Sequence, residues 1–298
     1  MPFKEIDVDT VYKGDPQLKK EDIKNLKEWA EMQPHLPKMT ELQLILFLQS
    51  CYYSNELAKT TIDIYFTVKT LCPDIFANRS IKDPAVKLAA TTMLASILPK
   101  RTPNGDTVIF FKLMDNNPDN FNFALQIRCF DMITLSHHHR EGPQNGITIL
   151  FDMQGIVFGH FLKLSVVIMK KLLYYLQEGM PIRLKSLQYF NIPSFMDKIL
   201  ALMKPFMKKE LYDSIQIHTT MESLYAQVPK DILPQEYGGS CESLKNLHDK
   251  FLKLMAESED LFKFQETQLA DESKRPGKPK SISDVFGMEG TFKKLEVD

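Results

Sequence analysis

The chain has 298 residues, of which 44% are hydrophobic, and a formal net charge of −1. This length and hydrophobic content predict a large buried core, organised as one domain or slightly more. The near-neutral charge excludes a general electrostatic attraction to nucleic acid or to anionic membranes, so either kind of binding would need a local basic patch.

Signals for export, membrane insertion and covalent cross-links are lacking. The first ten residues hold no basic stretch followed by an apolar run, so no signal peptide is indicated. No run of about 18 uncharged apolar residues predicts a membrane span. The cysteines Cys51, Cys72, Cys129 and Cys241 have no paired spacing, which favours reduced thiols over disulfides or a zinc site. We therefore expect a cytoplasmic protein.

The first ninety residues predict a small all-α domain, residues 1–90. Apolar residues recur at helical spacing from Glu21 to Met32, and two prolines follow. Thr40-Glu-Leu-Gln43 has the pattern of a capping box, which marks the start of a second helix. A third helix is expected from Asn55 to Leu71.

From Thr102 onward, strand patterns alternate with helix patterns. Strands are expected at residues 107–113, 147–151, 183–190 and 214–218, with helices at 121–135, 162–178 and 195–209. This alternation predicts an α/β domain, residues 91–265, with a mostly parallel sheet covered by helices. The chain should be helical again from Gly239 to about Phe264. The charged, Pro- and Gly-containing remainder, residues 266–298, predicts a flexible tail.

The most informative stretch runs from Asn145 to His160. The apolar run Ile147–Phe151 reads as a strand buried on both faces, and Asp152 and Gly155 follow it at a turn. Asp152 is expected to cap that turn by accepting backbone hydrogen bonds. Three further blocks are distinctive, and they are Gln-Pro-His-Leu-Pro at 33–37, Asn-Ile-Pro at 191–193 and Leu-Pro-Gln-Glu-Tyr-Gly-Gly at 233–239.

In this order, over roughly residues 20–265, these blocks resemble the CRAL-TRIO lipid-binding family. The resemblance is to its insect members in the α-tocopherol-transfer-like and retinaldehyde-binding-like branch. It implies a non-catalytic protein without a cofactor, which holds one small hydrophobic ligand between the sheet and a mobile lid helix. The segment from Phe195 to Phe206 occupies the lid position, and its apolar residues cover more than one helical stripe.

The resemblance also implies which residues line the pocket. Those expected to contact the ligand are Cys129, Ile133, Ile147, Phe151, Ile156, Leu172, Tyr175, Leu176, Met180, Ile182, Leu184, Leu187, Ile199 and Met203. Cys129 and Ile133 stand where tocopherol-carrying members have serines, which argues against tocopherol as the ligand because its hydroxyl would lose partners. Tyr175 is expected to supply one polar contact. The alternative for each position is ordinary core packing.

A basic cluster is implied at the membrane-binding positions of the family. Arg183 and Lys185 match two phosphoinositide-binding positions, whereas Glu210 and Ser214 occupy the other two. Lys204, Lys208 and Lys209 lie close enough in sequence to replace them, and each basic group near an anionic membrane contributes roughly 1 kcal/mol. An ordinary solvated charge run is the alternative.

Two features suggest a metal site or acid–base catalysis, but the sequence motifs that normally accompany such sites are missing. The run His137-His138-His139 invites a metal-site interpretation, yet consecutive helical residues do not face one ligand. Asp152 and His160 could suggest acid–base catalysis, but no nucleophile elbow, zinc motif or phosphate loop accompanies them. We therefore expect neither enzymatic activity nor a bound metal.

These observations lead to one preferred function and one rival. The preferred function is a cytoplasmic lipid-transfer protein, expected as a monomer, that carries a tocopherol, retinoid, carotenoid or similar lipid. It would exchange this ligand during transient peripheral contact with phosphoinositide-containing membranes, without binding nucleic acid. The rival is a lipid-responsive adaptor without net transfer, in which the C-terminal tail recruits a protein.

Overall fold

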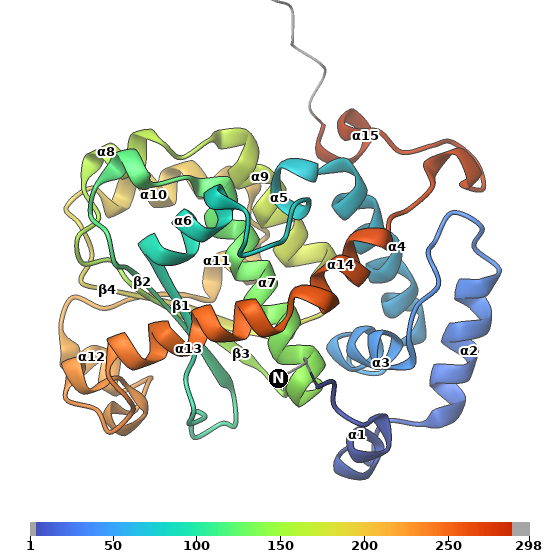
Figure 1. The fold of residues 1–298 in the computed structure, drawn as a ribbon, viewed down its shortest axis with the longest axis horizontal. Helices are drawn as coiled ribbons and strands as arrows, with labels where there is room; N and C mark the ends of the chain where they lie inside the picture. The colour runs from blue at the N-terminus through green and yellow to red at the C-terminus, as the bar shows by residue number, and fades with distance from the viewer. Residues whose placement is uncertain (1–3, 288–298) are drawn as a thin grey trace, which may run out of the picture.

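A computed structural model describes residues 4–287, and a five-stranded sheet lies at its centre (Figure 1). The strands are β1 (Met93–Ile97), β2 (Thr107–Leu113), β3 (Ile147–Asp152), β4 (Leu184–Phe190) and β5 (Ile215–Ile217). They are ordered β1-β2-β3-β4-β5, with β1 antiparallel to β2 and every other neighbouring pair parallel. The prediction of a mostly parallel sheet covered by helices is confirmed.

Helices precede the sheet, connect its strands and follow it. Those before the sheet are α1 (Val8–Gly14), α2 (Lys20–Glu31), α3 (Glu41–Ser50), α4 (Asn55–Leu71), α5 (Pro73–Phe76) and α6 (Pro84–Thr92). Those between strands are α7 (Phe123–Glu141), α8 (Phe158–Leu162), α9 (Val166–Tyr174), α10 (Met196–Met203) and α11 (Lys209–Asp213). Those after the sheet are α12 (Met221–Tyr225), α13 (Leu244–Glu257), α14 (Glu259–Thr267) and α15 (Ile282–Phe286).

The N-terminal region is helical because capping residues stand where the predicted helices begin and apolar residues follow at helical spacing. Thr40 and Gln43 form the predicted capping box, with each side chain bonded to the other residue's backbone N–H. The helix α4 has the predicted bounds, and the Ser54 hydroxyl accepts from the Leu57 N–H at its start. In Figure 1 the helices α1 to α3 lie to one side of the sheet.

The two faces of the sheet carry different cores. On one face Phe110, Leu150 and Phe190 pack in an apolar cluster with residues of the segment 224–247. The alternate residues of the same strands point to the opposite face. There Ile149 belongs to the larger core that also includes helices α3, α4, α7 and α9. The central strand is thus buried on both faces, as the sequence predicted, and Leu150 is completely buried.

Two predicted helices are interrupted in the structure. Residues 162–178 form the end of α8, the helix α9 and a π-helical turn, Tyr175–Gly179, in place of one continuous helix. The break before α9 falls at Ser165, whose hydroxyl caps the new helix. The lid segment consists of α10 and a 3-10 turn, Lys204–Phe206. Pro205 lacks the N–H that would continue the α-helical hydrogen-bond pattern.

The described part of the predicted tail packs on the rest of the protein. Arg275 pairs with Asp63 of α4 at 2.7 Å and with Glu272 at 2.5 Å. Phe286 in α15 is buried, and its ring meets Tyr174 of α9 edge-on, with centroids 5.4 Å apart. These contacts explain why residues 272–287 lie against helices although their composition is polar. Residues 288–298 of the predicted tail lie outside the described residues.

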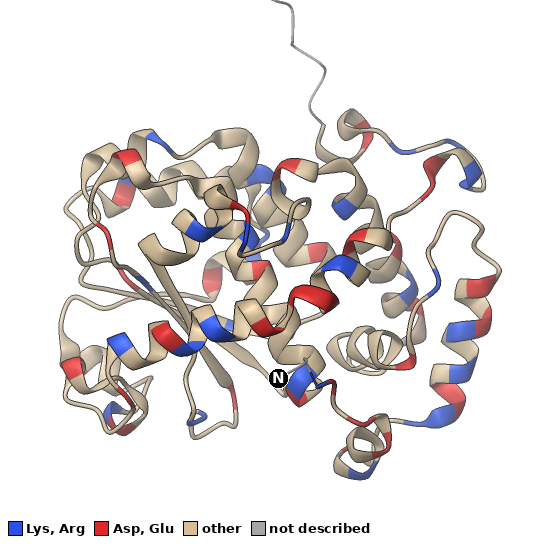
Figure 2. Ribbon diagram, in the orientation of Figure 1, with Lys and Arg blue, Asp and Glu red and all other residues tan. Residues whose placement is uncertain are grey.

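Charges of both signs are interspersed on the molecule. Figure 2 shows them mixed along α2 and α13, whereas α3 is almost free of charge. All four cysteines are reduced and buried. Within residues 4–287, no helix is long and apolar enough to cross a bilayer.

Candidate ligand cavity

A cavity of about 230 Å³ lies between the sheet and the helices α7, α9 and α10. Strands β2 to β4 supply its floor, and the segment 153–164 closes one side. Its lining is mostly apolar, as expected of a ligand site that gains affinity by burying hydrocarbon, about 25 cal/mol for each Å². The lid-position residues Ile199 and Met203 on α10 both contribute to the lining.

A row of stacked aromatic rings forms part of the floor. Phe111, Phe151 and Tyr189 are register partners on β2, β3 and β4. The ring centroids of Phe111 and Phe151 are 5.2 Å apart with planes 21° from parallel, and those of Phe151 and Tyr189 are 4.8 Å apart at 8°. Each such pair contributes about 0.5–1.5 kcal/mol beyond its buried area. Part of the floor is therefore a row of aromatic rings that crosses three neighbouring strands.

The structure brings seven of the predicted ligand residues to this cavity. They are Phe151, Ile156, Leu172, Leu176, Leu187, Ile199 and Met203. Sequence reasoning missed other lining residues, which include Met93, Phe111, Phe121, Gln126, Phe130, His160, Met169 and Tyr189. The alternation of β2 and β4 was a usable signal for Phe111 and Tyr189, because both lie on the same face of the sheet as Phe151.

The other seven predicted residues do not line the cavity. Cys129, Ile133 and Ile147 are buried in the main core, and Leu184 is partly buried there. Tyr175, Met180 and Ile182 line a second, small cavity of about 30 Å³ instead. The π-helical turn accounts for part of this difference. Its hydrogen bond from Met180 N–H to the Tyr175 carbonyl spans five residues, so Met180 is displaced from the position that a continuous α-helix would give it. Leu176, within the same turn, still lines the larger cavity.

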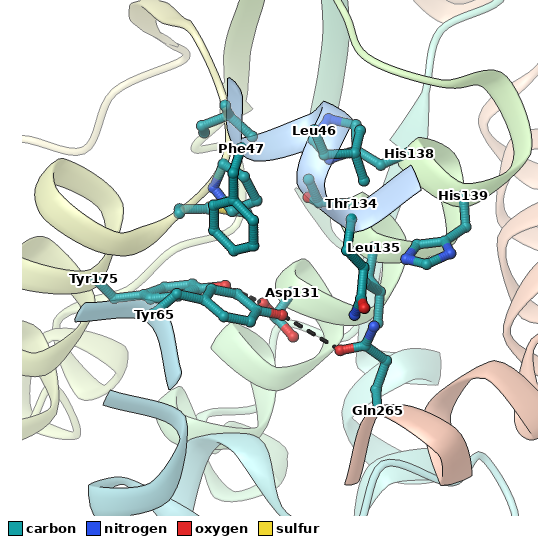
Figure 3. A pocket seen from close by; sticks show the side chains of 14 residues that line it. Leu46, Phe47, Tyr65, Asp131, Thr134, Leu135, His138, His139, Tyr175 and Gln265 are labelled. Atoms are coloured by element: carbon teal, nitrogen blue, oxygen red, sulfur yellow. Dashed lines mark hydrogen bonds between the residues drawn. The ribbon is translucent and has the colours of Figure 1, made fainter. Parts of the chain in front are cut away.

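The small cavity is lined by residues of α3, α4, α7, α14 and the π-helical turn (Figure 3). The Tyr175 hydroxyl donates to Asp131 at 2.7 Å, and Arg79 pairs with the same carboxylate at 3.1 Å. Tyr65 lies beside Tyr175 and donates to Gln265 of α14 at 3.5 Å. Tyr175 therefore completes a buried network around Asp131. Its expected polar contact with a ligand is replaced by this contact with the protein.

Asp152 is the polar centre at the carboxyl end of the sheet. Its carboxylate accepts from the Gln154 N–H at 2.9 Å, as a turn cap should. It also accepts from Lys112 at 2.5 Å, from Asn191 at 2.9 Å and from the Tyr237 hydroxyl. Burial, together with this bond to Asp152, raises the pKa of Tyr237. Three of the sequence blocks that carried the resemblance thus converge on one buried carboxylate.

Exposed apolar side chains gather beside the cavity. Val157, Phe158, Leu162, Val166 and Val167 are exposed, and Leu162 is 70% exposed. We call these five residues the apolar rim. Phe158 packs against Phe161, which lines the cavity, and edge-on against Phe195 before α10. All five residues of the apolar rim lie within residues 157–167, on and beside the helices α8 and α9.

The five predicted phosphoinositide-binding residues differ in their surroundings. Arg183 is partly buried, donates to the Gln49 carbonyl at 2.8 Å and lies over the Tyr52 ring at 4.3 Å. Lys185 also lies over Tyr52, at 5.6 Å.

The three lysines at the end of the lid segment and just after it are all exposed. Lys204 lies over the Tyr212 ring at 5.0 Å. Lys208 is paired with Glu178, and Lys209 with Asp213.

The three consecutive histidines lie near the C-terminal end of α7, with His138 and His139 in its last turn. His139 meets Glu5 at 2.7 Å through its Nδ1 atom, whereas His138 is buried beside the small cavity. In the described part of the chain, no group of three or more His, Cys, Asp or Glu side chains is placed to hold a metal ion.

The sheet, the cavity beneath α10 and the converging motifs define a CRAL-TRIO lipid-binding domain. Residues 91–239 match the family model described as the CRAL/TRIO domain. The chain therefore belongs to this family of lipid-binding and lipid-transfer proteins. Residues 15–86, which form most of the N-terminal helices, match the model described as the Pinta-like UBA domain.

Several known proteins are similar over most of the chain. The "Alpha-tocopherol transfer protein-like" protein of Homo sapiens is 28% identical over 234 residues, which cover 77% of this chain and 68% of that protein. Clavesin-1 of Mus musculus is 24% identical over 233 residues, covering 76% and 65%. The crystal structure of Sfh5 matches with a TM-score of 0.48 at 14% identity, over 70% of this chain and 74% of that one.

Proposed function

We propose that the protein binds one small hydrophobic lipid in the 230 Å³ cavity and exchanges it at phosphoinositide-containing membranes. The observation that carries this proposal is the apolar cavity itself, which lies in the CRAL/TRIO domain and has the aromatic row as its floor. The proposed ligand contacts are the seven predicted residues that line it. The protein is proposed to act as a non-enzymatic carrier.

The helix α10 is proposed to act as the lid. Ile199 and Met203 face the cavity, while Ala201 on the same helix is exposed. A bound lipid would favour the closed arrangement because its hydrocarbon would contact these residues only when α10 covers it. A membrane would favour an open arrangement by contacting the same apolar residues.

The apolar rim is proposed as the part of the surface that meets the bilayer. Basic groups then add attraction to anionic head groups, at roughly 1 kcal/mol each. Lys208 and Lys209 already have carboxylate partners in the protein, so Arg183, Lys185 and Lys204 should contribute more than these two. We therefore expect the rim to determine insertion and these three basic residues to determine the preference for anionic lipid.

A vesicle-transfer experiment tests the proposal. Purified protein would move a fluorescent retinoid or sterol from phosphatidylcholine vesicles to acceptor vesicles with and without phosphatidylinositol bisphosphate. Leu172→Trp should fill the cavity and lower ligand binding, because Leu172 lines it. Leu57→Trp is the matched control, since Leu57 is 57% exposed on α4 and far in sequence from the lining.

The membrane step needs a separate variant. Leu162→Asp with Val166→Asp should slow transfer at least several-fold while ligand binding in solution is kept, because both side chains are exposed. Failure of the wild-type protein to bind any hydrophobic probe would overturn the carrier function. Normal transfer by the double variant would remove the apolar rim from the membrane step.

A further inference from the structure

His160 brings a fixed hydrogen-bond donor to the lining of the cavity. It follows the turn after Asp152, is 3% exposed and is one of the lining residues. The Val157 N–H donates to its Nδ1 atom at 3.1 Å. An atom that accepts from a backbone N–H carries no proton of its own. In the neutral imidazole the proton is therefore on Nε2.

The neutral form is the one expected in this environment. Burial of the ring lowers the pKa of His160, since the charged form loses its hydration. Protonation would also place a hydrogen on Nδ1, facing the Val157 N–H. The ring is held edge-on to Phe121, with centroids 5.3 Å apart and planes at 87°, so it has a defined orientation.

The Nε2–H group of His160 has no hydrogen-bond acceptor in the described part of the chain. The Nε2 atom is buried and has no hydrogen-bond partner among residues 4–287. A buried donor without an acceptor destabilises the state that contains it. An oxygen atom on the bound lipid would remove this penalty, whereas a pure hydrocarbon would leave it in place.

The charged residues of the lining are already neutralised by each other. Lys112 and Asp152 both line the cavity, and their side chains form an ion pair at 2.5 Å. Asn191 and Tyr237 also donate to the carboxylate of Asp152. The paired lysine would have to leave Asp152 to bind a ligand carboxylate, and that would leave a buried charge unpaired.

We infer that the ligand is an uncharged lipid bearing an alcohol, carbonyl or ester oxygen, and that this oxygen accepts a hydrogen bond from His160 Nε2. The inference rests on the proposed function, because it specifies the class of lipid that the cavity takes. It excludes fatty acids and unsubstituted hydrocarbons as the preferred ligands.

A series of probes with one chain length and different head groups tests the inference. Dodecane, dodecanol, dodecanal and dodecanoate would each displace the fluorescent hydrocarbon diphenylhexatriene from the full-length protein at neutral pH. In the wild type, dodecanoate should bind more weakly than dodecanol. The decisive quantity is the change in affinity of each probe when His160 is altered, because this comparison cancels differences in hydrophobicity between the probes.

Two substitutions separate the donor from the local fold. His160→Asn keeps an oxygen near the position of Nδ1 for the Val157 N–H but removes the distant donor. It should weaken dodecanol and dodecanal about tenfold, equivalent to about 1.4 kcal/mol, without weakening dodecane. His160→Gln places an amide N–H near the position of Nε2 and should retain most of the preference.

Two further variants test a control histidine and an alternative hydrogen-bond donor to the ligand. His218 is similarly buried, but Ser223 and Gln188 occupy both its nitrogens, so His218→Asn should change no probe selectively. Tyr189→Phe removes the side-chain hydroxyl of another lining residue, which could also donate to a ligand oxygen.

Each result bears on the inference in a defined way. If His160→Asn weakened the binding of all four probes equally, the inference about the ligand oxygen would be overturned. The proposed function as a lipid carrier would still stand, because the wild type would bind the probes. Selective loss of dodecanol with Tyr189→Phe, and not with His160→Asn, would assign the contact to Tyr189. Tightest binding of dodecanoate would overturn the uncharged class. If the wild type bound none of the probes, the proposed function would fail together with this inference.

Discussion

Asp152 links segments that are distant in the sequence, because its two carboxylate oxygens accept hydrogen bonds from Lys112, Asn191 and Tyr237. Asn191 is the first residue after β4 and has a positive φ of 50°. Such a backbone conformation is uncommon outside glycine and is tolerated best by Asn and Asp. The bond from its side chain to Asp152 therefore helps to fix the point at which the chain leaves β4 for α10.

Replacing Asp152 by Asn should destabilise the protein. The substitution keeps the shape but leaves Lys112, whose side chain is 14% exposed, without its counter-charge. We expect a loss of about 2–4 kcal/mol in the free energy of unfolding, measured with urea. Asp249→Asn breaks an exposed pair with Lys245 and should cost less than about 1 kcal/mol. Equal losses in the two variants would contradict the importance of the buried network.

At the residue level, the sequence predicted that the cavity is apolar better than it predicted which residues line the cavity. Phe151 and Leu187 were predictable because strand alternation and the family resemblance agree for them. Tyr175 was assigned to the ligand, but its hydroxyl bonds to Asp131, and nothing in the local sequence marks Asp131 as buried. Long-range partners of this kind have no local signature.

Elements with strong local signals were predicted with their bounds. The helix α4 and the strand β2 begin and end where the sequence indicated, since caps, turns and periodicity coincide there. The segment after the central strand was predicted less well. A π-helical turn depends on one displaced hydrogen bond. Because apolar residues occur on all sides of residues 162–178, the hydrophobic pattern does not change at that turn and so does not predict it.

The segment of residues 272–287 should depend on Arg275 for its attachment. The Arg275 side chain is 8% exposed and bonds to Asp63, Thr67 and Glu272. Arg275→Met should accelerate hydrogen exchange of the α15 amides about tenfold, because charge-assisted bonds to α4 are lost.

Lys274→Met provides the matched comparison. Lys274 is 63% exposed and pairs with nearby Asp271, so exchange in α15 should remain as in the wild type. Unchanged exchange in Arg275→Met would show that other contacts, such as the packing of Phe286 and the pair of Lys280 with Asp63, hold the segment.

Across the whole molecule, burial of histidine makes stability depend on pH. Burial, reinforced by His137 and His139, lowers the pKa of His138 to about 3. Burial and the nearby Arg101 lower the pKa of His137 to about 4. In the unfolded chain both groups bind protons below about pH 6.5. The unfolded state therefore binds more protons than the folded state in the range between these values.

Stability should consequently be complete above about pH 6.5 and fall as the pH falls toward 4. Each histidine contributes a slope of up to about 1.4 kcal/mol for each pH unit in that range. Urea unfolding at about pH 7, 6 and 5 measures the slope. His138→Gln should make it shallower, and an unchanged slope would assign the acid sensitivity to other groups.

The division into a helical region, a lipid-binding domain and a tail stays a prediction for the chain as a whole. The small cavity shows contact between the helical region and the lipid-binding domain, because Tyr65 comes from the first and Tyr175 and Gln265 come from the second. Boundaries based on composition do not reveal such a junction, since the residues that form it are far apart in the sequence.

The four buried cysteines have a practical consequence. Burial raises the pKa of Cys72 and Cys129 to about 12, so these thiols do not react as thiolates while the fold is closed. Cys51 follows α3, Cys72 follows α4, Cys129 lies in α7 and Cys241 follows the Tyr237 turn. The native chain therefore carries chemical reporters in four separate regions. The order in which they become alkylated gives the sequence of local opening events without any introduced label.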